Sequence, residues 1–275
     1  MPENNRIQTG RTHINGTSFY YEFAGEGQPV VWVHAGIADR RMWDDQFYPL
    51  AQHFKVIRYD MRGYGETPIV AGPFSHRQDL YSLLQFLGIE QAYLVGCSQG
   101  GSTIIDFTLE HPEMVSALVL VACTLSGYKV FDQRPKQWDE LIAAFKQGNF
   151  ARASELEVQI WVDGPHRTPD QVDPKIRNRV REMNAIALTN EASDLGSDQP
   201  LAPAAVNRLT DIRVPTLVVI GDLDNPNMVK ASDLLQTSIA DTQKVVISDT
   251  AHLPNMEKPE EFNSVVLGFL LQHFA

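Results

Sequence analysis

The chain has 275 residues, of which 43% are hydrophobic and 21% are charged, a composition typical of a soluble globular protein and far from that of a disordered chain. Its formal net charge of −11 repels nucleic-acid phosphates and anionic membrane surfaces, so we expect neither as a partner. The first residues lack a signal-peptide pattern, no apolar run is long enough to cross a membrane, and only two cysteines are present. A cytoplasmic protein is therefore expected, with its oligomeric state left open.

The predicted elements begin with a hairpin, because β-type residues from 12 to 21 flank Asn15-Gly16, a dipeptide suited to a tight turn. Short apolar runs follow, each bounded by turn residues. Such runs are typical of strands buried on both faces of a parallel sheet. The predicted strands cover residues 29–34, 55–59, 92–95, 117–121, 216–220 and 244–247.

Amphipathic helical patterns lie between several of these strands. The clearest starts at Ser75, where Gln78 completes a capping-box pair, and stops at Gly88. Another runs from Pro259 to the C-terminus. Strands that alternate with helices predict parallel β-α-β units and a three-layer sandwich.

One stretch, residues 126–203, breaks this alternation because it contains no convincing buried strand. We interpret it as a helical cap inserted over one edge of the sheet, with residues 1–125 and 204–275 forming one core domain. Its helix-like segments are expected at residues 136–145, 151–161 and 175–188.

The segment most informative about chemistry is Gly96-Cys97-Ser98-Gln99-Gly100. It has the G-x-S-x-G pattern between an apolar strand and a helical pattern, the setting in which a nucleophile elbow exposes a serine. At the helix N-terminus, the free backbone N–H of Gln99 and the helix dipole would favour developing negative charge. A chance match in a glycine-rich turn is the alternative, and the flanking elements argue against it. Cys97 and Cys123 are expected to be buried filler rather than thiol nucleophiles.

Two later loops supply candidates for an acid and a base. Asp222 and Asp224 follow the strand at 216–220, and His252 follows the strand at 244–247. Ligands bind at the carboxyl ends of parallel strands, so both loops are well placed. The chain order serine, acid, histidine differs from that of chymotrypsin and subtilisin and accompanies the G-x-S-x-G elbow. Asp222 and Asp224 both stay open on this reasoning, and Asp249 is a weaker competitor.

This combination suits nucleophilic catalysis. A serine hydroxyl is almost never ionised at neutral pH, so it needs a base in hydrogen-bond contact to take its proton during attack. A neutral histidine can take that proton, and an aspartate can fix the histidine tautomer and stabilise the imidazolium.

Together the motifs resemble those of the α/β-hydrolase superfamily, specifically the branch of small carboxylesterases, 3-oxoadipate enol-lactonases and C–C hydrolases. The resemblance covers nearly the whole chain and implies the α/β-hydrolase fold, a mostly parallel central sheet flanked by helices. It also implies Ser98, Asp224 and His252 as the catalytic triad, which favours Asp224 over Asp222. The segments that carry the resemblance are residues 60–65, 96–101, 221–224 and 249–259.

The resemblance further implies an oxyanion hole. The Gln99 N–H would be one donor, and the other would be the N–H of Gly36 or Ile37, because relatives commonly have His-Gly where this chain has His34-Ala35-Gly36.

Other parts of the family pattern limit the chemistry. Asp60 and Arg62 match a salt-bridged loop that looks structural in relatives. Serine at the elbow, in place of aspartate, argues against haloalkane dehalogenase and epoxide hydrolase chemistry. No metal and no other cofactor is expected, because the 8 histidines are scattered without ligand spacing.

The expected function is hydrolysis of a carboxylic ester or lactone of a small, largely uncharged substrate through an acyl-enzyme on Ser98. The expected pocket is apolar and formed under the cap by residues such as Trp138, Trp161 or Met183, for which packing inside the cap is an equal alternative. Cleavage of a C–C bond or an enol-lactone on the same triad is the enzymatic alternative. A small-ligand receptor that retains the triad is the alternative of another class.

Overall fold

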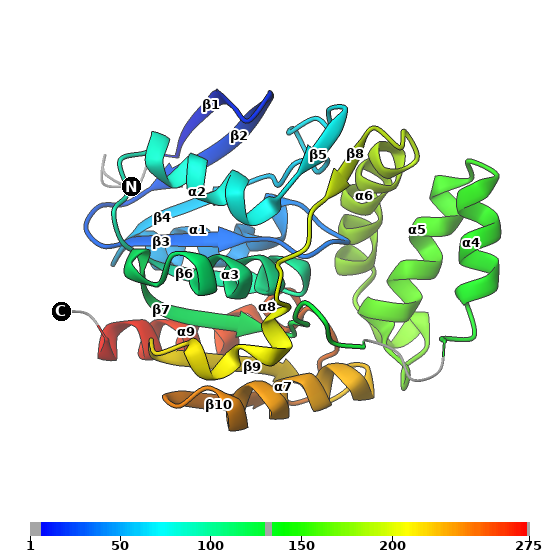
Figure 1. Cartoon of the computed structure of the whole chain (residues 1–275). Coiled ribbons are helices and arrows are strands. Elements are labelled where there is room, and N and C mark those ends of the chain that lie inside the picture. The colour runs from blue at the N-terminus through cyan, green and yellow to red at the C-terminus, as the bar shows by residue number, and fades with distance from the viewer. Residues whose placement is uncertain (1–6, 130–133, 274–275) are drawn as a thin grey trace.

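The computed structural model describes residues 7–129 and 134–273. Its centre is an eight-stranded sheet of order β1-β2-β4-β3-β6-β7-β9-β10 (Figure 1). The β1–β2 hairpin is antiparallel and joins β4 in antiparallel register, whereas all pairs from β4 to β10 are parallel. The strands are β1 (Gln8–Ile14), β2 (Thr17–Ala24), β3 (Pro29–Val33), β4 (Lys55–Tyr59), β6 (Ala92–Cys97), β7 (Val115–Val121), β9 (Thr216–Gly221) and β10 (Thr242–Ile247).

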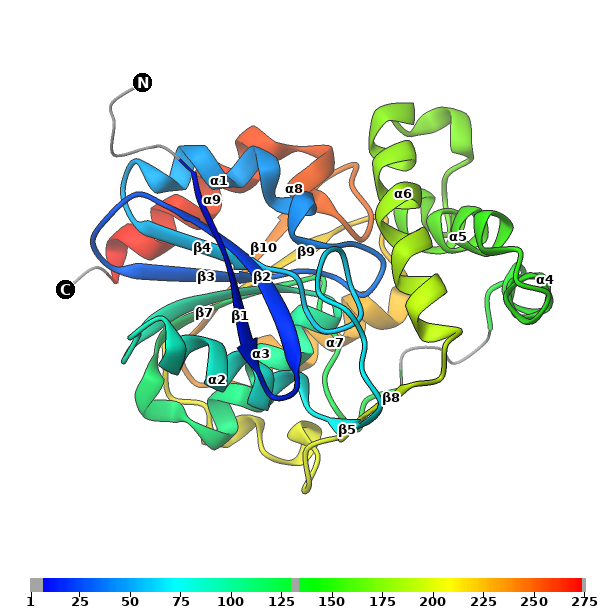
Figure 2. The same cartoon turned by 90° about the horizontal axis from the view of Figure 1, so that it is seen from above.

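Helices cover both faces of this sheet, as Figure 2 shows from above. One face carries α1 and α9, and the other carries α2, α3 and α7. The described α-helices are α1 (Asp44–Ala51), α2 (His76–Phe86), α3 (Gln99–Glu110), α4 (Trp138–Lys146), α5 (Phe150–Val158), α6 (Pro174–Glu191), α7 (Pro226–Ser238), α8 (Pro254–Glu257) and α9 (Pro259–Gln272).

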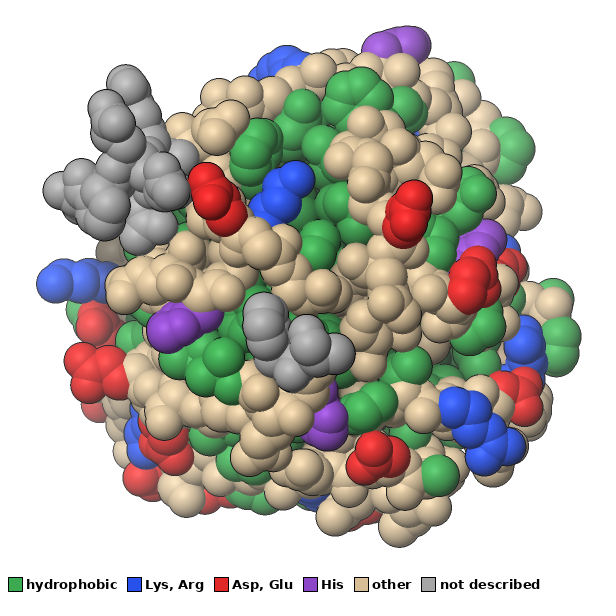
Figure 3. All heavy atoms as spheres, turned by 90° about the vertical axis from the view of Figure 1, so that its left-hand side faces the viewer, with side chains coloured by type: hydrophobic (Ala, Val, Ile, Leu, Met, Phe, Trp, Pro, Cys, Tyr) green, Lys and Arg blue, Asp and Glu red, His purple; other side chains and the backbone are tan. Residues whose placement is uncertain are grey.

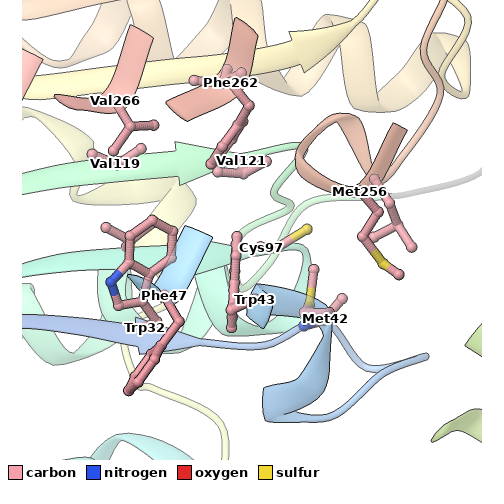
Figure 4. Packing of buried hydrophobic residues seen from close by; sticks show 14 of the residues in the cluster. Trp32, Met42, Trp43, Phe47, Cys97, Val119, Val121, Met256, Phe262 and Val266 are labelled. Atoms are coloured by element: carbon pink, nitrogen blue, oxygen red, sulfur yellow. Dashed lines mark hydrogen bonds between the residues drawn. The ribbon is translucent and has the colours of Figure 1, made fainter. Parts of the chain in front are cut away.

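The buried strands carry apolar side chains on both faces because each face of the sheet packs against helices. Along β3, Val30 and Trp32 pack on the side of α1 and α9, while Val31 and Val33 pack on the side of α2 and α3. Figure 4 shows the first of these layers, in which Trp32 meets Trp43 at a ring-centroid distance of 4.7 Å. The predicted three-layer sandwich is therefore confirmed.

Most predicted elements are present with small shifts at their ends. The Ser75 side chain accepts the Gln78 N–H and caps α2, as the capping-box pattern predicts. The helices α1 and α7 were not predicted individually. A second sheet, formed by the parallel strands β5 (Gly72–Phe74) and β8 (Gly196–Asp198), was not predicted either. The strand β8 lies inside the stretch expected to lack a buried strand, and it is short and largely exposed.

The helices α4, α5 and α6 lie beyond the carboxyl ends of the parallel strands (Figure 1). They pack on one another through a small apolar cluster that includes Leu141, Leu156 and Leu188. The predicted domain limits include residues 1–6, 130–133 and 274–275, which lie outside the described residues. The division into a core and a cap of residues 126–203 therefore stays a prediction, and "cap helices" here means α4, α5 and α6.

The end of the molecule opposite the cap helices has a surface of mixed charge. Figure 3 shows acidic and basic side chains scattered over this face instead of gathered in one patch. Within the part of the chain that the structure describes, no helix has the length and apolarity needed to span a bilayer. The cavity described next lies at the other end, under the cap helices.

Candidate active site

Ser98 sits on a sharp turn between β6 and α3. Its backbone angles are φ 52° and ψ −115°, a combination that costs a non-glycine residue energy and that clusters at functional sites. The Ser98 N–H donates to the Val121 carbonyl at 2.9 Å, and its carbonyl accepts the Ser102 N–H at 3.0 Å. The surrounding backbone thus holds the serine in a strained conformation at the N-terminus of α3.

Glycines on either side of Ser98 allow this turn by leaving room for backbone. A Cβ on Gly96 would lie 2.5 Å from the Gly100 carbonyl oxygen, and a Cβ on Gly100 would lie 2.3 Å from the Val33 carbonyl oxygen. Real Cβ atoms do not approach backbone so closely, and backbone cannot move aside as a flexible side chain can. The G-x-S-x-G spacing therefore has a steric cause in this fold.

The structure brings His252 and Asp224 together. Nδ1 of His252 lies 2.9 Å from Oδ2 of Asp224, and the two residues are 1% and 2% exposed. Oδ1 of Asp224 accepts the Asn225 N–H at 2.7 Å, which fixes the carboxylate. An ionised carboxylate only accepts hydrogen bonds, so Nδ1 carries the proton and Nε2 is the ring nitrogen that can take one.

The two competing aspartates lie elsewhere. Asp222 is exposed to solvent. The Asp249 side chain is 85% exposed and lies 3.6 Å from the Lys258 ammonium. Neither contacts the imidazole of His252, so the geometry selects Asp224 among the three carboxylates.

Cys97 lies behind the histidine. Its thiol contacts the His252 carbonyl at 3.8 Å and is fully buried. Burial and the nearby Asp224 charge raise the pKa of the Cys97 thiol well above its usual value. The thiolate needed for a nucleophile is therefore disfavoured. Cys123 is also buried, and it packs in the core beside α3.

A cavity of about 900 Å³ opens between the sheet edge and the cap helices. Ser98 and His252 both line it, and so do the three residues expected to form the oxyanion hole. Those three are Gly36, Ile37 and Gln99. The candidate nucleophile, the candidate base and the expected oxyanion donors therefore all line a single cavity.

The loop after β3 closely approaches the start of α3. A Cβ on Gly36 would lie 2.5 Å from Oε1 of Gln99, the same oxygen that accepts the Tyr64 hydroxyl at 2.8 Å. Gln99 is the first residue of α3, so its backbone N–H has no acceptor within the helix. Among the described residues, the structure gives no acceptor for the N–H groups of Gly36 and Ile37, so the choice between them stays open.

His34, in the same loop, has a structural role. Its Nε2 accepts the Met61 N–H at 2.9 Å, and its Nδ1 lies 2.8 Å from the Ala35 carbonyl oxygen. Burial lowers the pKa of His34 to about 4. A neutral imidazole therefore ties the loop after β3 to the loop after β4.

The cavity differs in part from the predicted apolar pocket. Trp138 and Trp161 line it, as expected. Met183 does not, because it is fully buried among Val158, Val162 and Val180 at the base of the cap helices. Helical periodicity marks Met183 as inward-facing, but it cannot tell whether the side chain faces the cavity or the apolar core. Carboxylates also line the cavity. The carboxylates that line the cavity are Glu157, Glu191, Asp194 and Asp198.

The motif at residues 60–65 forms buried ion pairs. Asp60 accepts from the Arg40 guanidinium at 2.7 Å, and Arg62 makes two bonds of 2.8 Å to Asp79. Arg62 also donates to the Asn15 carbonyl at 2.9 Å. The two residues therefore pair with separate partners, and Arg62 reaches the cavity wall with its charge already matched.

One ion pair beside the histidine loop was not predicted. Arg167 donates to Glu257 at 2.6 and 3.2 Å, and Glu257 accepts the Ala251 N–H at 2.8 Å, next to His252. Arg167 also donates to the Val162 carbonyl at 2.6 Å. Glu257 lies in the segment 249–259 that carries the resemblance, which is a signal for it, whereas nothing in the sequence singles out Arg167.

Metal ligation has no site in this arrangement. Within residues 7–129 and 134–273, no group of three or more histidine, cysteine, aspartate or glutamate side chains is placed to hold a metal ion.

Comparison with known proteins gives the family. A family model described as alpha/beta hydrolase fold matches residues 28–259. The chain is 27% identical to 3-oxoadipate enol-lactonase 1 of Acinetobacter baylyi, over 98% of this chain and 96% of that protein. It is 24% identical to 2-hydroxy-6-oxo-6-phenylhexa-2,4-dienoate hydrolase of Comamonas testosteroni, over 92% of this chain and 91% of that protein. The chain therefore belongs to the α/β hydrolase fold family.

A solved structure agrees with this assignment. A structure of Est816, described as an N-acyl homoserine lactone degrading enzyme, matches with a TM-score of 0.76 at 26% identity, covering 94% of this chain and 100% of that one. The named relatives are hydrolases, which supports hydrolysis as the class of reaction.

Proposed function

We propose that this protein hydrolyses a carboxylic ester or lactone of a small molecule through an acyl-enzyme on Ser98. The observation that carries the proposal is the 2.9 Å contact between Nδ1 of His252 and Oδ2 of Asp224 in a cavity that Ser98 also lines. A histidine oriented in this way is the base that a serine nucleophile requires.

In the first half of the proposed reaction, Ser98 Oγ forms a bond to the substrate carbonyl carbon. The hydroxyl proton passes to Nε2 of His252, and the carbonyl oxygen becomes an oxyanion. Asp224 stabilises the imidazolium without taking a proton itself. The tetrahedral intermediate then expels the alcohol oxygen, which takes the proton from His252, and Ser98 remains acylated.

Water completes the reaction in the second half. It loses a proton to Nε2 of His252 as its oxygen attacks the acyl carbon, and collapse of the intermediate returns this proton to Ser98 Oγ. The products are a carboxylic acid and an alcohol, which stay joined if the substrate is a lactone. In both halves the oxyanion lies at the N-terminus of α3, where the Gln99 N–H and one N–H from Gly36 or Ile37 would donate to it.

The lining of the cavity favours this substrate class over a dienoate. The two named relatives act on 3-oxoadipate enol-lactone and on a phenylhexadienoate, compounds that carry carboxylate groups. Of the described residues that line the cavity here, Arg62 is the only lysine or arginine, and Asp79 already accepts from it twice. A carboxylate on the substrate would thus meet acidic side chains without a free cation to bind it.

A short p-nitrophenyl ester tests the proposal. We expect turnover by the wild type, loss of turnover in Ser98→Ala, and a fluorophosphonate adduct that mass spectrometry maps to Ser98. Equal inactivity of both proteins over a broad ester panel would favour a ligand receptor instead. Turnover of a vinylogous diketone, with all esters left intact, would favour C–C hydrolysis.

A further inference from the structure

The cap side of the cavity is acidic. Glu157 comes from α5 and Glu191 is the last residue of α6, and both line the cavity together with Asn184. The Asn184 amide donates to Oε2 of Glu157 at 2.5 Å. Asp194 and Asp198 also line this cavity. Glu157 is half-buried, whereas Glu191, Asp194 and Asp198 are exposed to solvent.

These carboxylates lack counter-ions of the kind that Glu140 and Glu155 have on the same cap helices. Glu155, two residues before Glu157, contacts the guanidinium groups of Arg177 and Arg181. Among the described residues, no lysine, arginine or histidine forms an ion pair with Glu157 or Glu191. Burial, together with the charge of Glu191, raises the pKa of Glu157, and burial raises the pKa of Glu191.

A second polar group in the same cavity is unsatisfied. His76 is 6% exposed, and its Nδ1 has no hydrogen-bond partner among the described residues. Burial lowers the pKa of His76, so its imidazole is neutral. With the proton on Nε2, Nδ1 is an acceptor. A buried acceptor left without a donor is costly, and an N–H group of a ligand that donates a hydrogen bond would satisfy it.

We propose that the cavity selects esters that carry a positively charged nitrogen, and that Glu157 and Glu191 bind this group while Ser98 attacks the ester carbonyl. This inference rests on the proposed ester hydrolysis. A cation placed on the cap side relieves the repulsion between two carboxylates that have no counter-ion within the described chain. The negative electrostatic potential of these carboxylates raises the local concentration of cationic substrates and repels anionic ones.

The volume and arrangement of the cavity suit such a substrate. Its volume of about 900 Å³ lies within the range of small-molecule sites. Trp138 and Trp161 line it as well, and aromatic faces attract ammonium groups. The charged end of the ester would therefore meet carboxylates and indole rings, while its carbonyl meets the N-terminus of α3.

A matched pair of esters tests the selection. The 2-(dimethylamino)ethyl ester of butyric acid, which is protonated at neutral pH, and 3-methylbutyl butyrate share the acyl group and the shape of the alcohol. They differ by one positive charge and its N–H donor. We expect kcat/KM for the protonated aminoethyl ester to exceed that for the neutral ester by about tenfold, equivalent to ~1.4 kcal/mol. The preference should appear mainly in KM and should shrink at high salt, which screens charges.

Variants connect the preference to the cap carboxylates. In Glu157→Gln/Glu191→Gln the ratio of kcat/KM for the charged ester to kcat/KM for the neutral ester should fall to about one. Glu182→Gln is the matched control, because Glu182 is exposed on α6 and does not line the cavity. It should keep the tenfold preference. Thermal melting checks that all three proteins fold.

Binding to the Ser98→Ala protein separates this inference from the proposed function. Calorimetry should show the protonated aminoethyl ester bound about tenfold more tightly than the neutral ester, whether or not the wild type turns over any ester. Equal binding of the two esters, or a preference that survives in the protein that also carries Glu157→Gln/Glu191→Gln, would overturn the inference. Ester hydrolysis without any charge preference would overturn it and leave the proposed function standing.

Discussion

The indole of Trp161 packs against the imidazole of His252, with ring centroids 4.6 Å apart and planes inclined by 37°. The Trp161 carbonyl also accepts the His252 backbone N–H at 3.3 Å. Trp161 follows α5, in the π-helical turn Gln159–Asp163. The proposed base is thus held from the cap side by Trp161 and from the sheet side by Asp224.

Replacing Trp161 tests the ring contact. In Trp161→Leu the backbone bond to His252 persists, but the imidazole loses a flat surface that limits its rotation. We expect kcat on a neutral p-nitrophenyl ester to fall about tenfold while the melting temperature changes little. Trp138→Leu, which alters the same cavity away from this ring contact, is the control. An equal loss of kcat in both variants would contradict a positioning role for Trp161.

Removing the charge at position 224 tests the acid assignment. Asp224→Asn keeps the shape of the side chain and can still accept the Asn225 N–H, but it no longer holds the histidine in the tautomer with a free Nε2. We expect kcat to fall by about 10⁴, as in serine hydrolases that lose this carboxylate. Steady-state kinetics should find Asp222→Asn close to the wild type, and the reverse pattern would reassign the acid.

The Arg167–Glu257 pair should couple stability to activity. Both side chains are largely buried, so Glu257→Gln leaves the Arg167 guanidinium without its counter-charge and should cost about 3 kcal/mol of unfolding free energy. It should also lower kcat, because the ion pair with Arg167 fixes the side chain that accepts the Ala251 N–H beside His252. Denaturant unfolding of Arg167→Met/Glu257→Gln should show a smaller loss than the sum of the single variants. Simple additivity would show that the pair does not act as a unit.

The close approach at Gly36 predicts a repairable defect. In Gly36→Ala the new methyl group would lie against Oε1 of Gln99, which the Tyr64 hydroxyl holds by a hydrogen bond, and would strain the loop that would supply an oxyanion donor. We expect kcat/KM to fall by about 10 to 100-fold. Adding Gln99→Ala removes the obstructing side chain and keeps the backbone donor, so the double variant should recover to the level of Gln99→Ala alone. A double variant no better than Gly36→Ala would rule out this clash as the cause.

Asp106 predicts a pH effect on stability. Burial in α3 raises its pKa to about 6 from 3.8, although the Ser126 hydroxyl donates to it at 2.9 Å. The unfolded chain therefore loses this proton first, so the contribution of Asp106 to stability falls as pH rises from about 4 to about 6. Asp106→Asn should be more stable than the wild type by about 1 kcal/mol at pH 8. At pH 4 the difference should vanish, and an equal difference at both pH values would contradict the raised pKa.

Much of the sheet could be predicted because buried parallel strands are apolar on both faces, so that β3, β6, β7 and β9 stand out as short runs. The helix α1 could not, because half of its eight residues are not buried and Pro49 lies within it. The pair β5–β8 joins residues far apart in the chain by backbone bonds alone, and backbone bonding leaves little trace in side-chain patterns.

The sequence singles out candidate site residues where chemistry fixes the residue type. Ser98, Asp224 and His252 each follow a recognisable strand, and the structure places all three at one end of the sheet. The polarity of the cavity was not predictable. Glu155 and Glu157 are two residues apart on one helix, yet one contacts arginines and the other faces the cavity. Only the packing of α6 against α5 decides which of the two glutamates contacts arginines and which faces the cavity.

The hydrogen bonds of Trp161 and Arg167 limit how the cap helices can move away from the sheet. Both residues lie in the stretch that connects α5 to α6. The Trp161 carbonyl accepts the His252 N–H, and Arg167 donates to the Asp249 carbonyl in the same loop and to Glu257 of α8. A hinge that lifted α4, α5 and α6 as one lid would pull the imidazole away from Asp224. We therefore expect substrate to enter and product to leave through local movements of the cap helices away from Trp161 and Arg167. The stretch that connects α5 to α6 would stay fixed throughout each turnover.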